Sequence, residues 1–289
     1  MSRAQAAATD APDDRVIAEV VRNFDRNRYW SALFAPEPIR AHLLALYAYN
    51  VELSRIPEQV NEAMFGEVRL QWWRDALDPL NEDGPTGHPV ADALMRTRAA
   101  FDIPHAALID MAEARLFDLG REMTPDAPTL DAYLQRTAGA IFRLGCRIAG
   151  VEAERAEPAC AAAARAYGLT GLLRALPYHA ARGRLFLPAD HFAAHGVDPY
   201  ALLRGEARPE LHRALTYLRA DARRHLQDAR ASLRGISPAS LTVFLPLALI
   251  EPYLDRLARP ERRPLLDIVE LNPAARLWRI ARAHYKGAV

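Results

Sequence analysis

Lysine is almost absent from the sequence. It occurs once, at Lys286, so arginine supplies nearly all of the 37 basic side chains. The 36 acidic residues balance these and leave a formal net charge of +1. A chain without an excess of charge lacks the long-range field that gathers nucleic acid, so we expect no nucleic-acid partner. Because the arginines are scattered, a compositional bias explains them more readily than a shared anion-binding task.

Cysteine and long apolar runs are also scarce. Cys146 and Cys160 are the only cysteines, which excludes a disulfide framework and a cysteine-rich metal site. The longest apolar run, 241–250, is interrupted by Pro246 and has about half of the ~20 residues that a bilayer span needs. Residues 1–14 carry aspartates but no continuous apolar stretch, unlike a secretory signal. We expect a disordered tail at 1–14 and a cytoplasmic protein, with peripheral contact at the inner membrane left open.

The spacing of hydrophobic residues points to one fold class. They recur at intervals of three and four, and sustained alternation is missing, which predicts an all-α helical bundle. No repeat or linker divides the chain, so we expect a single domain over residues 15–289. One helix should run from Ile39 to Ile56, where Pro57 would stop it. Further helices are expected near 70–77, 90–101, 104–122, 129–150 with Thr129 as N-cap, 156–176, 209–234, 237–257 and 262–285.

Two groups of polar residues stand out from these helices. Tyr47, Asn50 and Ser54 share one stripe of the 39–56 helix, so they could line a cavity or form a polar cluster satisfied by neighbouring helices. The second group surrounds a proline expected to break a helix, Pro177. It consists of Arg174, Tyr178, His179, Arg182 and Arg184. Arginine forks of this kind bind phosphates or carboxylates, although caps and loop anchors have the same composition.

Two segments carry a resemblance to a known family. The first is RYWSALFAPEPIRAHLLALYAYNVELSRIPEQV followed by GEVRLQWWRDAL, and the second is YGLTGLLRALPYHAARGRLFLP. They resemble the squalene/phytoene synthases, in which a GRxxLP signature occurs as Gly183, Arg184, Leu187 and Pro188 do here. The resemblance implies an isoprenoid-synthase-like helical bundle with a central cavity.

In that family, aspartate-rich motifs hold magnesium ions that stabilise the departing diphosphate. Aligned on this chain, the aspartates of the first motif fall at Ser54, Arg55 and Glu58. The acidic residues of the second fall at Ala175, Tyr178 and His179. Glu58 alone keeps a carboxylate, so we expect no catalytic residue, no metal site and no cofactor; magnesium would be needed only by an atypical synthase.

The replacements resemble a branch of the family that includes a mitochondrial assembly factor of respiratory complex I, NADH:ubiquinone oxidoreductase. QWW and the LPYH element carry this likeness. It implies a non-catalytic factor with a protein partner in respiratory complex assembly. Two alternatives remain: a head-to-head prenyl-diphosphate transferase with an atypical site, and an isoprenoid- or lipid-binding protein.

Overall fold

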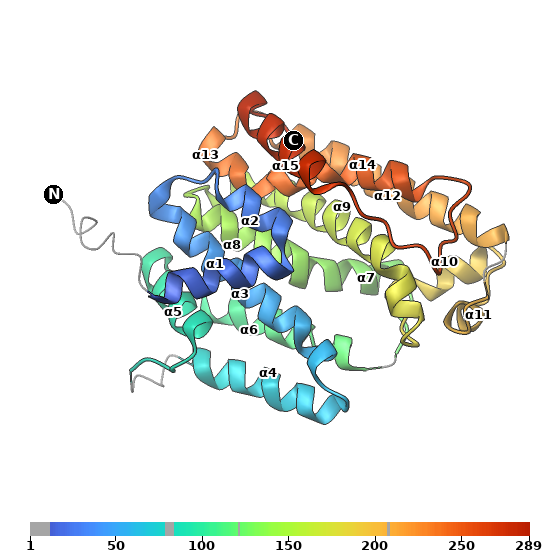
Figure 1. Cartoon of the computed structure of the whole chain (residues 1–289), viewed down its shortest axis with the longest axis horizontal. Helices are drawn as coiled ribbons and strands as arrows, with labels where there is room; N and C mark the ends of the chain where they lie inside the picture. The colour runs from blue at the N-terminus through green and yellow to red at the C-terminus, as the bar shows by residue number, and fades with distance from the viewer. Residues whose placement is uncertain (1–11, 79–83, 121, 207–208) are drawn as a thin grey trace.

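The computed structural model describes residues 12–78, 84–120, 122–206 and 209–289. Every regular element within these ranges is helical, and they contain no β-strand. The expected all-α bundle is therefore confirmed (Figure 1). Residues 1–11, to which most of the expected tail belongs, lie outside the described residues. The tail and the single domain stay predictions.

The N-terminal half contains α1 (Pro12–Phe24), α2 (Arg26–Ala32), α3 (Glu37–Gln59), α4 (Ala63–Leu77), α5 (Pro89–Phe101), α6 (His105–Ala114) and the short 3-10 turn η1 (Phe117–Leu119). The elements from residue 127 onward are α7 (Ala127–Leu134), the π-helical turn η2 (Gln135–Gly139), α8 (Ala140–Ile148), α9 (Ala153–Ala180), α10 (Ala189–Ala194), α11 (Pro199–Leu203), α12 (Pro209–Ser232), α13 (Pro238–Leu241), the 3-10 segment η3 (Thr242–Leu249), α14 (Ile250–Leu257) and α15 (Pro273–Lys286).

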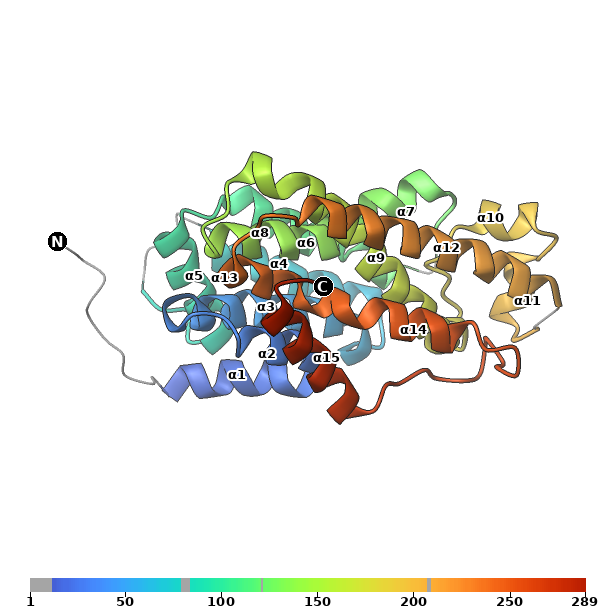
Figure 2. The ribbon, with the colours of Figure 1, turned by 90° about the horizontal axis from the view of Figure 1, so that it is seen from above.

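Helix α9 runs through the middle of the bundle. It packs along α12 and against η2 and α8, as Figures 1 and 2 show from two directions. Small residues make this close packing feasible, since Ala163 and Ala166 are fully buried. At Gly168 a β-carbon would lie 2.6 Å from Cδ2 of Leu134, so a larger residue there would force the Leu134 side chain to shift. Helix α3 packs against α1, α5 and α8 on the other side of the core.

Two expected helix breaks at prolines are wrong. Helix α3 continues through Pro57 to Gln59, and α9 continues through Pro177 to Ala180. A proline removes one backbone donor and crowds one carbonyl a turn earlier. That cost is tolerable so close to a helix end, and both helices stop within one turn of the proline.

Several expected boundaries also differ. Helix α6 ends at Ala114, well before the expected 122, and only η1 continues the segment. The N-cap of α7 is Asp126, whose Oδ1 accepts from the backbone N–H of Thr129 at 2.8 Å. The last helix begins at Pro273 and not near 262. Its cap is Asn272, whose side chain accepts from backbone N–H groups of the first turn.

Candidate ligand cavity

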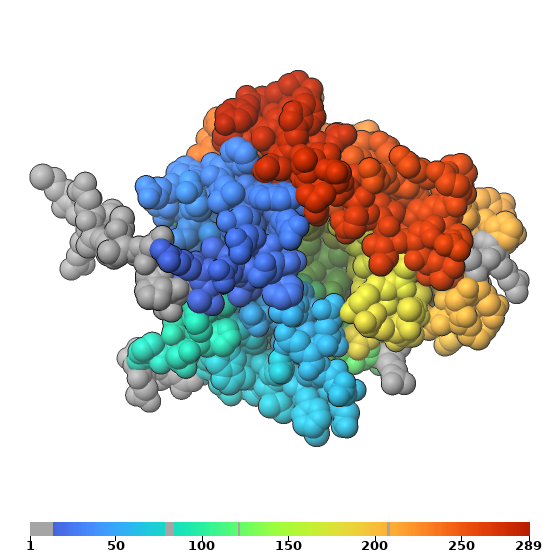
Figure 3. All heavy atoms as spheres, in the orientation of Figure 1, coloured from blue at the N-terminus to red at the C-terminus, as the bar shows by residue number. Residues whose placement is uncertain are grey.

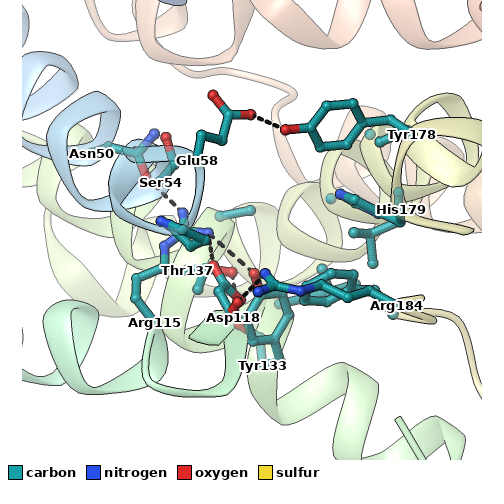
Figure 4. A pocket seen from close by; sticks show the side chains of 18 of the residues that line it. Asn50, Ser54, Glu58, Arg115, Asp118, Tyr133, Thr137, Tyr178, His179 and Arg184 are labelled. Atoms are coloured by element: carbon teal, nitrogen blue, oxygen red, sulfur yellow. Dashed lines mark hydrogen bonds and ion pairs between the residues drawn. The ribbon is translucent and has the colours of Figure 1, made fainter. Parts of the chain in front are cut away.

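A cavity of about 650 Å³ lies between α3, α9, η1 and the α7–η2 junction. Figure 3 shows it as a hollow in one face of the molecule, bordered by the blue N-terminal helices, the yellow end of α9 and the red C-terminal segment. Figure 4 shows its polar side chains. Those that precede α7 are Arg28, Asn50, Ser54, Glu58, Asn61, Arg115 and Asp118; those from α7 onward are Tyr133, Thr137, Tyr167, Tyr178, His179, Arg182 and Arg184.

The two polar groups expected from the sequence meet in this cavity. Of the eight candidate residues, the structure brings six to the cavity wall: Asn50, Ser54, Tyr178, His179, Arg182 and Arg184. These residues come from two segments that are far apart in the sequence. The fold places α3 opposite α9, which brings the two segments to the same cavity. Whether any of them binds a ligand stays a prediction.

Tyr47 and Arg174 do not line the cavity. Tyr47 is 1% exposed and belongs to the hydrophobic core. Arg174 turns outward from α9, where its guanidinium lies 3.8 Å from the ring centroid of Tyr253 and 2.8 Å from Oε1 of Glu270. The neighbouring Ala175 does face the cavity. One residue along a helix rotates the side chain by about 100°, which carries Arg174 to the side facing α14.

A buried polar cluster forms the floor of the cavity. Arg115 donates to Oδ2 of Asp118 at 3.0 Å, to the hydroxyl of Tyr133 at 3.1 Å and to Oδ1 of Asn50 at 3.2 Å. Burial acts to lower the pKa of the Arg115 guanidinium, but Tyr133 and Asp118 outweigh it and raise the pKa. Arg184 donates to the backbone carbonyl of Asp118. The floor is therefore held in place by hydrogen bonds and an ion pair to Arg115, although Oδ1 of Asp118 is buried without a hydrogen-bond partner.

The sequence analysis missed most of this floor. Arg115, Asp118 and Tyr133 lie in segments expected to be ordinary helices, and no motif marks them. The spacing of three between Arg115 and Asp118 is compatible with an ion pair on one helical turn, but surface helices have the same spacing. Arg28 was also missed. It is buried, pairs with Asp25 at 2.7 Å and lies 4.6 Å from the ring centroid of Tyr167.

A hydrogen bond at the mouth of the cavity joins α3 to α9. The hydroxyl of Tyr178 donates to Oε1 of Glu58 at 2.8 Å, and the guanidinium of Arg182 lies 3.6 Å from the centre of the Tyr178 ring. Ser54 sits one turn before Glu58 and donates to the carbonyl of Val51 at 3.0 Å. The guanidinium of Arg55 leaves the cavity and stacks on Phe24 at 3.4 Å.

His179 is neutral at physiological pH. Burial, followed by the positive charges of Arg184 and Arg182, lowers its pKa to about 4. Its ring packs beside Phe186 with 4.6 Å between the centroids. A neutral imidazole in this place can donate one hydrogen bond and accept another.

The described residues contain no group of three or more His, Cys, Asp or Glu side chains arranged to hold a metal ion. Nor does any helix in the described ranges combine the length and hydrophobicity of a membrane span.

Comparison with known proteins gives a family and a fold. The chain matches the family description squalene/phytoene synthase over residues 21–281. It is 30% identical to the NADH dehydrogenase (ubiquinone) complex I assembly factor 6 of Bos taurus, over 84% of this chain and 73% of the relative. The same factor of Homo sapiens is 27% identical over 85% and 74%. The phytoene synthase of Thermus thermophilus is 27% identical over 86% and 85%.

Solved structures share the architecture. A dehydrosqualene synthase superposes with a TM-score of 0.80 at 18% identity, covering 95% of this chain and 96% of that one. The squalene synthase of Alicyclobacillus acidocaldarius superposes with a TM-score of 0.74 at 20% identity, covering 85% and 92%. The helical bundle, its cavity and the match over residues 21–281 agree, and the chain belongs to the squalene/phytoene synthase family.

Proposed function

We propose that this chain is a non-catalytic assembly factor for a respiratory complex of the type named for its relatives, NADH dehydrogenase (ubiquinone) complex I. The observation that carries the proposal is the state of the carboxylates in the cavity. Glu58 accepts a hydrogen bond from Tyr178, and Asp118 pairs with Arg115. Both carboxylates are engaged by side chains of the protein itself.

Magnesium diphosphate does not fit these residues. A cluster of hard cations needs several carboxylate oxygens converging from facing helices. Among the described lining residues only Glu58 and Asp118 are acidic, while Arg28, Arg115, Arg182 and Arg184 supply positive charge. Positive side chains at the wall repel a cation instead of holding one. The geometry therefore favours a protein that keeps the cavity but does not carry out the metal-dependent ionisation of a diphosphate.

The cavity itself supports a binding role. Its volume of about 650 Å³ is in the range of small-molecule sites. Leu134, Ala138, Leu172 and Phe186 give it an apolar wall, and Arg182 and Arg184 lie at its polar side. An isoprenoid or lipid with an acidic head group suits this combination. In this proposal the bound ligand adjusts the shape of the assembly factor or is delivered during assembly.

A prenyl-diphosphate transferase remains the second candidate, because the relatives include a phytoene synthase that matches over 85% of its own length. The two roles predict different outcomes when a prenyl diphosphate is supplied. A transferase releases diphosphate and forms a joined product, whereas an assembly factor does neither. The cytoplasmic location expected from the sequence stays a prediction under both.

The assembly role can be tested in a strain that lacks the gene. We expect NADH-driven oxygen consumption and the amount of assembled complex I to fall, and oxygen consumption driven by succinate to stay unchanged, since succinate donates electrons after complex I. A plasmid copy of the gene should restore the loss. Unchanged complex I in the deletion strain would rule out the assembly role.

A further inference from the structure

The C-terminal helix has an unusual charge for this chain. Residues 271–289 contain no aspartate or glutamate, although acidic and basic residues are balanced over the whole sequence. The basic side chains of α15 are Arg276, Arg279, Arg282 and Lys286. A local concentration of positive charge on a nearly neutral protein acts only at short range, within about 10 Å at 0.1 M salt.

Large apolar side chains accompany these charges on the surface. Trp278 is 61% exposed and Tyr285 is 81% exposed, and the neighbouring Leu277 is exposed as well. Ile280 and Ala283 are buried and attach the helix to η3 and α2. Trp278 and Tyr285 lie seven residues apart, so they share the outward side of the helix.

The basic residues of α15 differ in the contacts they make. Arg276 turns inward, with an ion pair to Glu270 at 3.7 Å and the ring of Trp30 at 5.4 Å. Arg279 and Lys286 are exposed and have no ion pair within the described part of the chain. The guanidinium of Arg282 lies 5.5 Å from the ring centroid of Trp278. The outward side of α15 therefore combines uncompensated cations with aromatic rings.

The chain segment that leads into this helix borders the hollow of the cavity. Figure 2 shows α15 and the segment that precedes it on the same side of the bundle as α1, and Figure 3 shows the red C-terminal segment bordering the hollow. The preceding segment adds two exposed aliphatic side chains, Leu266 and Ile268. The apolar exposure thus continues along the chain from 266 to 285.

We propose that the outward side of α15, together with Leu266 and Ile268, docks on the surface of a bilayer that contains anionic lipid. Tryptophan and tyrosine favour the level of the head groups, and arginine and lysine are attracted to anionic lipid while their stems cover apolar surface. A helix with this pairing of residues lies in the plane of the interface. Docking in this way turns the cavity mouth toward the membrane, where an acidic lipid would enter.

The inference develops the acidic lipid ligand of the proposed function, but its test does not depend on assembly. The purified full chain is mixed with vesicles of phosphatidylcholine alone or with about one third phosphatidylglycerol, and flotation separates bound from free protein. We expect binding to the anionic vesicles that weakens as salt is raised, and little binding to phosphatidylcholine. Absence of binding to the anionic vesicles would overturn the inference.

Variants locate the surface. Arg279→Gln with Arg282→Gln should weaken partitioning roughly tenfold or more, and Trp278→Ser with Tyr285→Ser should weaken it at every salt concentration. Each has a control elsewhere that removes the same number of charges or of exposed aromatic side chains. Arg213→Gln with Arg234→Gln is the charge control, and Phe65→Ser with Trp72→Ser on α4 is the apolar control; Phe65, Trp72, Arg213 and Arg234 are exposed.

Equal losses in the controls and the α15 variants would contradict the assigned surface. If the α15 variants bound vesicles normally yet lowered complex I in cells, the surface would belong to a protein partner and the membrane inference would fail. The assembly role would survive that outcome, so the two failures are distinguishable.

Discussion

The hydroxyl of Tyr178 donates a hydrogen bond of 2.8 Å to Oε1 of Glu58, and the two residues are 120 positions apart. The resemblance to the synthase motifs predicts acidic residues at both positions. A carboxylate that accepts from a phenol is already partly satisfied, and burial together with Glu58 raises the pKa of Tyr178, which keeps it a donor. The bond joins the end of α3 to the end of α9 at the mouth of the cavity.

The ion pair on the cavity floor should dominate local stability. Replacing Asp118 by alanine leaves the Arg115 guanidinium buried without its carboxylate, and we expect a loss of about 3–5 kcal/mol in the free energy of unfolding. The exposed pair of Arg143 and Glu157 is the control, because Glu157→Ala should cost less than about 1 kcal/mol. Urea unfolding of both variants measures the difference. Equal losses would show that Arg115 finds water or another partner.

His179 should make stability depend on pH. Its folded pKa of about 4 lies below its ordinary value of 6.5, so the unfolded chain takes up a proton first as pH falls. The contribution to stability is complete above pH 6.5, is lost between 6.5 and 4, and changes no further below 4. The slope in this window should be at most about 1.4 kcal/mol per pH unit. Unfolding curves of His179→Gln should show a shallower slope, and an unchanged slope would place the titration elsewhere.

Gly171 offers a way to fill the cavity. It lies in α9 and lines the cavity, and a β-carbon added there would meet no atom within 4 Å. Gly171→Leu should fill part of the space, while Gly171→Ala leaves most of it open. Both should raise the thermal midpoint, since glycine in a helix interior costs about 1 kcal/mol relative to alanine.

The two variants therefore separate binding from folding. In the deletion strain, the alanine variant should restore complex I and the leucine variant should not. Full restoration by Gly171→Leu would show that the open cavity is not needed for assembly.

The residues at the mouth should matter for function more than for stability. We expect His179→Ala with Arg182→Ala to lower assembled complex I in cells while the free energy of unfolding changes by about 1 kcal/mol or less, because neither side chain lies in the core. Arg213→Ala, on the exposed side of α12, is a control for loss of a surface arginine. A parallel loss of folded protein would make the segment structural.

The helical class and six of the residues that line the cavity could be predicted from the sequence for a physical reason. Helical periodicity put Asn50 and Ser54 on one stripe, and the motif around Arg184 identified the opposite wall. The prediction failed at Arg174, where the direction of a side chain depends on how α9 is rotated against α14. Arg115 and Asp118 could not be recognised either, because an ion pair becomes buried only through packing. Pro57 and Pro177 led to wrong helix ends. The rule that proline breaks a helix does not say that a proline within one turn of the end is tolerated.

The proposed non-catalytic role depends most directly on whether a prenyl diphosphate reacts in this cavity. Purified protein should be incubated with farnesyl diphosphate and magnesium, and the released diphosphate and the organic products should be measured. With Glu58 held by Tyr178 and Asp118 held by Arg115, we predict no diphosphate release above a protein-free control and no joined product. Magnesium-dependent formation of a joined prenyl product would contradict the account.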